Sequence, residues 1–338
     1  MRFSRLAVSV VVGVLGAVAV AAASPPAYEQ SQQRILVEGR AVAALARAGD
    51  ANGIYGRFTP ELAREVPLAD VERVLADIRG AAPIGARTAE SALPMAPNRR
   101  AYTALHRWGG REVVLLAVFD DRGAIAAIDL APPKALPPDP HAGRRLRTHL
   151  SLPFNGTWWV FWGGPTERQN YHVVAPDQRH AYDFVVWRFG ATHRGAGTTN
   201  SDYWAWGRTV LAPAAGRVVE AVDGVRDNRP QVQVENPQAP AGNHVVLDLG
   251  KREYALLAHF QKGSVRVRVG DRVQAGAVLG RTGNSGNSSE PHLHFHVQDR
   301  QALFGSARGL PLAFVDYLAD GRRIARGTPL QGQFILTS

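Results

Sequence analysis

The residues best suited to chemistry lie in Pro291-His292-Leu293-His294-Phe295, which follows a stretch of glycine, asparagine and serine over residues 283–289. Residues two apart in a β-strand point to the same side, so His292 and His294 would present two imidazoles from one face. Imidazole is a common zinc ligand and a general base near neutral pH. The pattern predicts a metal site or an acid–base site that other parts of the chain must complete.

The elements around this motif are short β-strands. From about residue 155 onward, turn-rich spacing predicts strands at Val210–Pro213, Gly216–Val222, Asn243–Leu249, Tyr254–Phe260, Gly276–Arg281 and His292–Val297. The sequence predicts the same unit at residues 211–218 and again at residues 269–276: a strand, a glycine turn and a second strand. This unit recurs in barrel-sandwich folds. The sequence therefore predicts a mainly antiparallel β domain of barrel-sandwich type over residues 148–338.

A different pattern occupies residues 28–131. Helical periodicity covers residues 30–48 and 68–78, and Thr59-Pro60 marks another helix start, with the threonine as cap. Strand-like runs follow at residues 101–107, 112–120 and 124–130. The order predicts an α+β accessory domain that resembles NTF2-like (cystatin-like) modules. The proline-rich residues 132–147 predict a semi-rigid linker between the two domains.

Composition narrows the classes of protein. The 338 residues include 45% hydrophobic residues and no cysteine, which excludes disulfides, thiolate metal sites and a thiol nucleophile. Arg2 and Arg5 precede an apolar stretch and the small residues Ala21-Ala22-Ala23, so we predict an export signal over residues 1–23. An uncleaved membrane anchor is the alternative. The cleaved signal and the uncleaved anchor both predict a periplasmic, cell-envelope or extracellular protein.

The net charge of +10 would attract anionic partners. The arginines are scattered or in short clusters, such as Arg144, Arg145 and Arg147, without interleaved aromatic residues. We therefore expect no nucleic-acid partner, interpret the basic surface as mainly solvated, and leave peripheral contact with an anionic membrane open. The pattern predicts no particular oligomeric state.

Several separated motifs occur in an order that resembles the lysostaphin/LytM-type zinc metallopeptidases of family M23. They are the strand–turn–strand unit at residues 211–218, Leu257-Ala258-His259-Phe260, Gly270-Asp271-Arg272-Val273 and the segment with the two histidines at residues 283–295. The resemblance covers about residues 155–300. It implies one Zn²⁺ per chain, with His294 as a ligand. It also implies catalytic roles, through hydrogen bonds, for His292 and His259.

The remaining ligands implied by the resemblance are an aspartate and a histidine further upstream. Asp183 leads into the apolar run at residues 184–186 and matches the aspartate. The family usually carries these two ligands as HxxxD, and this chain departs from that spacing. His180 is three residues from Asp183, and an extended strand would point two such side chains to opposite faces. A loop containing Pro176 can return His172 to the Asp183 side, so we favour His172, and His180 would then either support the ligands or serve in packing.

Two imidazoles and one carboxylate would leave the fourth tetrahedral position of zinc for water, as in catalytic rather than structural zinc sites. Zinc in such a site lowers the pKa of bound water to about 7 and polarises a carbonyl group. We interpret His296 as a polar neighbour of this site rather than a ligand. The long segments 188–207 and 223–242 would either wall a substrate groove or form surface insertions.

The sequence thus predicts an exported zinc metalloendopeptidase. The family resemblance implies peptidoglycan as the substrate, cut in its stem or cross-bridge peptides, with another peptide as the broader class. The alternative is a non-catalytic relative that regulates other cell-wall hydrolases. A third interpretation, a barrel-sandwich carrier domain, needs a modified lysine on a tight hairpin, and neither Lys251 nor Lys262 lies in a Met-Lys turn.

Overall fold

The computed structural model describes residues 25–79, 84–94, 99–108, 111–132, 136–232, 236, 238–303 and 305–337. The chain divides into two compact units, with the boundary between Ala135 and Leu136. The predicted export signal at residues 1–23 lies outside the described residues. Among the helices that the structure describes, none combines the length and apolar character needed to cross a membrane.

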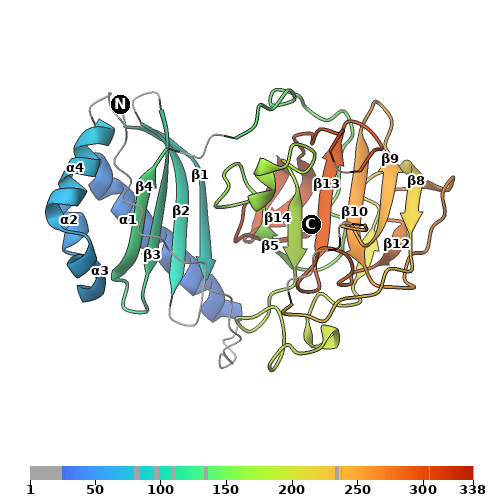
Figure 1. The fold of residues 1–338 in the computed structure, drawn as a ribbon, viewed down its shortest axis with the longest axis horizontal. Helices are drawn as coiled ribbons and strands as arrows, with labels where there is room; N and C mark the ends of the chain where they lie inside the picture. Colours follow the sequence, from blue (N-terminus) through green and yellow to red (C-terminus); the bar gives the residue numbers. More distant parts are fainter. Residues whose placement is uncertain are drawn as a thin grey trace. The chain divides into compact units, whose positions relative to one another are not determined.

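The first unit contains helices followed by an antiparallel sheet, as the sequence predicts (Figure 1). The helices are α1 (Pro25–Ala48), α2 (Ala51–Tyr55), α3 (Pro60–Glu65) and α4 (Leu68–Arg79). The strands, which pair in sequence order, are β1 (Ile84–Pro94), β2 (Arg100–Trp108), β3 (Arg111–Phe119) and β4 (Ile125–Ala131). The resemblance of this unit to NTF2-like modules stays a prediction.

The core of the first unit lies between the helices and the sheet. Ile35 and Val42 of α1 belong to one buried cluster with Tyr102 of β2 and Leu115 of β3. The hydroxyl of Thr59 accepts a hydrogen bond from the backbone N–H of Leu62, which caps α3. The unit therefore has an apolar core of its own.

The second unit is built on a ten-stranded sheet with the order β11-β8-β9-β10-β13-β6-β5-β16-β14-β15, and β12 pairs with β7 in a smaller sheet. The strands are β5 (Trp158–Trp162), β6 (Tyr182–Val185), β7 (Thr209–Leu211), β8 (Gly216–Val222), β9 (Asn243–Asp248), β10 (Tyr254–Phe260), β11 (Arg272–Val273), β12 (Val278–Arg281), β13 (Leu293–Gln298), β14 (Phe314–Ala319), β15 (Arg322–Gly327) and β16 (Phe334–Thr337). Each pairing between these strands is antiparallel. The predicted fold class is confirmed, although the larger sheet does not close into a barrel over the described strands.

Three adjacent strands near the middle of the large sheet, β10, β13 and β6, carry the candidate site. Figure 1 shows β10 beside β13. Leu293, Phe295 and Val297 of β13 are fully buried in the main core cluster. Side chains alternate along a strand, so the residues between them face the opposite side. This alternation, set by the apolar residues, fixes the direction of the histidines of β13.

The predicted linker at residues 132–147 extends across the boundary between the units. Its later part packs on the second unit: the Arg179 guanidinium donates a hydrogen bond to the carbonyl of Pro137 at 2.5 Å. The His141 imidazole lies 3.3 Å from a carboxylate oxygen of Asp299. These contacts attach residues 137–141 to the second unit, so this part is not a free spacer.

Candidate metal centre

The centre begins with a pair of residues that face each other across two strands. In the antiparallel register, His294 of β13 lies directly opposite Asp183 of β6. Directly opposed side chains in such a pair share one face of the sheet. The Nδ1 atom of His294 consequently lies 2.9 Å from Oδ1 of Asp183.

His172 reaches the same place from a short 3₁₀-helix, η1 (Tyr171–Val174). The side chain of Asn170 caps this helix by accepting a hydrogen bond from the backbone N–H of His172. Nε2 of His172 lies 3.6 Å from Oδ2 of Asp183. One ligand atom from each of His172, Asp183 and His294 lies within 4.8 Å of the others, and all three residues are buried.

His180 lies elsewhere, although it is closer to Asp183 in sequence. Its Nε2 atom is 3.0 Å from Oδ2 of Asp139. Asp183 lies on the face of β6 opposite that of Tyr182, which packs in the core. The geometry therefore brings His172, not His180, beside Asp183.

His259 reaches the site because β10 is irregular at its end. Ala258 pairs with His294, so alternation alone would turn the next residue, His259, toward the core. The β9–β10 register shifts between Leu257 and Phe260, and His259 has a φ of 64°. Such a bulge re-aims a side chain. The His259 ring consequently lies 4.7 Å from that of His292 and 5.7 Å from that of His294, between ring centroids.

Backbone carbonyls fix the tautomers of the two histidines outside the cluster of three. Nδ1 of His259 lies 2.8 Å from the carbonyl oxygen of Ser285, and Nδ1 of His292 lies 2.8 Å from that of Glu290. A carbonyl can only accept, so each Nδ1 carries the proton, and in the neutral imidazole Nε2 is an acceptor. Nε2 of His292 lies 3.7 Å from Oδ1 of Asp183.

Hydrogen bonds likewise fix His172. The amide nitrogen of Asn170 donates to the carbonyl of Ala181, which orients the oxygen of that amide toward His172 Nδ1 at 2.8 Å. His172 therefore carries its proton on Nδ1, and its Nε2 presents a lone pair to Asp183.

A longer chain of hydrogen bonds orients His294. The Gln298 amide nitrogen donates to the carbonyls of Arg300 and Ala302, so its Oε1 accepts from Nε2 of His296, 3.0 Å away. Neutral His296 then accepts at Nδ1 from Nε2 of His294, over 2.9 Å. This leaves the lone pair on Nδ1 of His294 facing the Asp183 carboxylate.

Burial sets the charge states of this cluster. It lowers the pKa of His294 to about 4 and of His296 to about 3. It also lowers the pKa of His172 and His259 well below the usual range. Burial raises the pKa of Asp183 to about 6, although nearby His292 acts in the opposite direction. Near neutral pH, these four imidazoles are therefore neutral and the Asp183 carboxylate is mainly ionised.

This donor set fits zinc. Two imidazole nitrogens and a carboxylate oxygen are zinc ligands, and the second nitrogen of each histidine is already engaged, as is usual for metal-bound imidazole. The His294 lone pair and the Asp183 carboxylate, 2.9 Å apart, are both acceptors and would repel each other without a cation or proton between them. A divalent cation removes that repulsion.

Two long segments attach to the turn that delivers His292. Asn228, from segment 223–242, donates from its amide to the carbonyls of Gly286 and Ser288. Thr192, from segment 188–207, donates from its hydroxyl to a carboxylate oxygen of Glu290 over 2.9 Å. The two segments thus converge on residues 286–290, next to the site.

Sequence reasoning did not find the groups that orient the histidines. The Ser285 and Glu290 carbonyls belong to the backbone and leave no sequence signal. Asn170 and Gln298 do leave one, because each lies two residues from a histidine of the site, within reach of a local hydrogen bond.

A known family matches part of the C-terminal unit. Residues 201–304 match the model of Peptidase family M23, a range that includes His259, His292 and His294 but not His172 or Asp183. This match covers the part of the C-terminal unit that carries the motifs at residues 211–295 and supports their resemblance to M23 peptidases. Among curated proteins, none matches this chain.

Solved structures of peptidases show low similarity to the chain. The solution structure of lysostaphin is 22% identical over 49% of this chain and 52% of that chain, with a TM-score of 0.31. The catalytic domain of lysostaphin from Staphylococcus simulans is 19% identical over 46% of this chain and 88% of that chain, with a TM-score of 0.27. A zinc-containing peptidase from Vibrio cholerae is 16% identical over 59% of this chain and 53% of that chain, with a TM-score of 0.28.

Proposed function

We propose that this protein is an exported zinc metalloendopeptidase. The observation that carries the proposal is the convergence of His172, Asp183 and His294, whose potential ligand atoms lie within 4.8 Å of one another. Three protein ligands leave an open coordination position, which is the arrangement of catalytic zinc. The match of residues 201–304 to the model of Peptidase family M23 supports the reaction class.

His172 would hold the metal through Nε2, His294 through Nδ1, and Asp183 through its carboxylate. When bound, zinc would lower the pKa of a water molecule and polarise the carbonyl of the peptide bond. The lone pairs of these nitrogens are already directed into the site by hydrogen bonds to Asn170 and His296. Preorganisation of this kind lowers the cost of binding the metal.

His292 and His259 would act on protons. In the neutral form each presents an unprotonated Nε2, which can accept a proton from the attacking water as a general base. The protonated imidazole then becomes a donor, which can stabilise the oxyanion of the tetrahedral intermediate or protonate the leaving amine. The carbonyls of Ser285 and Glu290 hold both rings in the orientation that this transfer needs.

The proposed substrate is peptidoglycan, cut in its stem or cross-bridge peptides. The match to Peptidase family M23, the predicted export signal and the net charge of +10 all suit an anionic wall polymer. Segments 188–207 and 223–242 would wall the groove that holds the peptide. The half-exposed ring of Tyr171, 3.9 Å from the His172 ring between centroids, offers an apolar contact beside the cluster.

Metal analysis combined with digestion of purified sacculi tests this function. We expect one zinc per chain and release of soluble peptides by the wild-type protein. Asp183→Asn and His172→Ala should lose zinc and lower the rate by roughly 100-fold or more, whereas His180→Ala should keep both. Zinc-free protein that only stimulates a second wall hydrolase would instead support the regulator. Zinc loss in His180→Ala alone would overturn the ligand assignment.

A further inference from the structure

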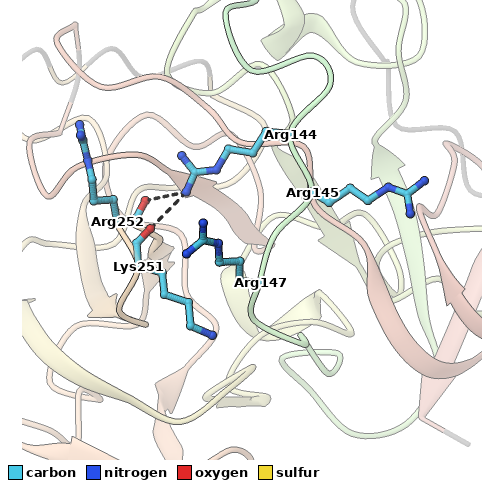
Figure 2. A pocket seen from close by; sticks show the side chains of 5 residues that line it. All are labelled: Arg144, Arg145, Arg147, Lys251 and Arg252. Atoms are coloured by element: carbon cyan, nitrogen blue, oxygen red, sulfur yellow. Dashed lines mark hydrogen bonds between the residues drawn. The ribbon is translucent and has the colours of Figure 1, made fainter.

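A second feature of the C-terminal unit lies away from the metal centre. Arg144, Arg145, Arg147, Lys251 and Arg252 line a cavity of about 530 Å³ (Figure 2). Lys251 and Arg252 belong to the turn before β10, whereas His259 lies near the other end of that strand. At 3.3 Å per residue, the two places are roughly 20 Å apart.

The turn between β9 and β10 has an unfavourable conformation for its residues. Lys251 and Arg252 have φ values of 58° and 59°, and the N–H of Glu253 donates to the carbonyl of Gly250 to close the turn. Hairpin turns with two positive φ angles favour Asn-Gly, because longer side chains strain this region. Lys251 and Arg252 therefore occupy positions whose backbone conformation is unfavourable for long side chains. Backbone strain of this kind concentrates at functional sites.

Glu253 holds the two basic segments together. Its side chain is 0% exposed, and it accepts hydrogen bonds from the backbone N–H groups of Arg147 and Thr148 at 2.8 and 3.1 Å. The Arg144 guanidinium donates to the carbonyls of Lys251 and Arg252 (Figure 2). These contacts place residues 144–148 against the turn, so the concentration of positive charge is built into the fold.

Three of the cations are available to a ligand. Arg147, Lys251 and Arg252 are exposed, and within the part of the chain that the structure describes none of them lies within ion-pair distance of a carboxylate. Figure 2 shows Arg147 directed toward the turn, whereas Arg145 points away from it. Glu253, which follows Arg252 in the chain, is occupied by backbone donors and by Arg144 at 3.7 Å.

We propose that this cavity binds a ligand with clustered phosphate groups. Each phosphate carries up to two negative charges, and guanidinium groups match its oxygens with paired hydrogen bonds. The cavity is concave and is lined by charged residues alone, so it lacks the apolar side chains that enter a bilayer and the aromatic side chains that stack on bases. This binding site is separate from the proposed peptidase site and does not depend on it.

Titration calorimetry of the full-length protein with inorganic tripolyphosphate tests the proposal. We expect saturable binding of one tripolyphosphate per chain that weakens as salt increases. Lys251→Asn/Arg252→Gly removes two charges and supplies the residues that the turn prefers, so it should weaken binding at least tenfold without lowering the melting temperature. Arg147→Ala, which leaves the turn intact, should also weaken it.

Lys262→Ala/Arg323→Ala is the matched control, because it removes the same charge at exposed positions that do not line the cavity. It should change affinity less than twofold. Equal weakening in both double variants would show a general effect of net charge and overturn the proposal. Absence of saturable tripolyphosphate binding would also overturn it, whether or not the protein binds anionic vesicles or an oligonucleotide.

Discussion

At the scale of single residues, the site depends on which ring nitrogen carries each proton. His172, His259 and His292 each direct Nδ1 to an oxygen, whereas His294 directs Nε2 to His296. In His294 the proton is on Nε2, so Nδ1 keeps its lone pair and can bind a metal ion. The motifs and the family resemblance predict the residues, but only the hydrogen-bond partners assign the atoms.

His296 is the residue whose effect on zinc is easiest to isolate. His296→Ala should weaken zinc binding by roughly 10- to 100-fold, because His294 loses the acceptor that fixes its tautomer. His296→Gln can still offer an acceptor and should recover part of this loss. Competition with a chromophoric chelator measures both. Wild-type affinity in His296→Ala would contradict a role for this residue in orienting His294.

The loss of zinc affinity at acidic pH should reflect the protonation of Asp183. Its pKa is raised to about 6 by burial, so protonation competes with zinc as the pH falls below that value. The pKa of His294 is lowered to about 4, so it competes little above pH 5. We expect zinc affinity to be nearly constant from pH 8 to 7 and about tenfold weaker at pH 5 than at pH 7. The same chelator competition, repeated at each pH, measures this.

A steady loss of zinc affinity already between pH 8 and 7 would contradict these charge states. It would indicate a histidine with a normal or raised pKa among the ligands. His172, whose pKa burial lowers, would then be the first residue to reconsider.

At the scale of elements, the strand pattern was largely predictable. Tyr254–Phe260 and Gly216–Val222 are strands with the predicted bounds, because each is a short run rich in apolar residues between clear turns. The strand Ile84–Pro94 was not predicted, since its alanines, glycine and charged residues lack alternation. It exists because β2 pairs with it, a tertiary influence that propensity does not contain.

The candidate site was predictable to a similar degree. Two-residue alternation places His292 and His294 on one face, as expected. The same rule would have turned His259 away, and only the bulge and its left-handed backbone bring the ring back. No local sequence signal marks that bulge, because it follows from the pairing of β9 with β10.

The bulge makes a prediction about stability. Glycine adopts a φ of 64° without the strain that a Cβ atom adds. His259→Gly should therefore be more stable than His259→Ala by about 1 kcal/mol, while both lose the imidazole and the activity. Urea unfolding of the two variants gives the comparison. Greater stability of the alanine variant would show that this backbone conformation carries no strain.

At the scale of the whole molecule, the chain has two units with separate apolar cores. The metal centre lies entirely within the second unit. A ligand that binds only the folded state raises the stability of the unit that holds it. We therefore expect a zinc chelator to lower the melting temperature of the second unit by several degrees and to leave that of the first unchanged.

Calorimetry of the full-length protein, with and without chelator, measures this effect. His106 provides a probe of the first unit, because it is buried in β2 and absent from the metal cluster. Its NMR signal should follow a melting curve that does not respond to zinc. A zinc-dependent shift of that curve would contradict the assignment of zinc to the second unit alone.

The most direct test is an anomalous difference map at the zinc absorption edge, from crystals of the metal-loaded protein. We expect one strong peak bonded to Nε2 of His172, the Asp183 carboxylate and Nδ1 of His294. A map with no peak at this place, or one whose peak is bonded to His180, would contradict this expectation.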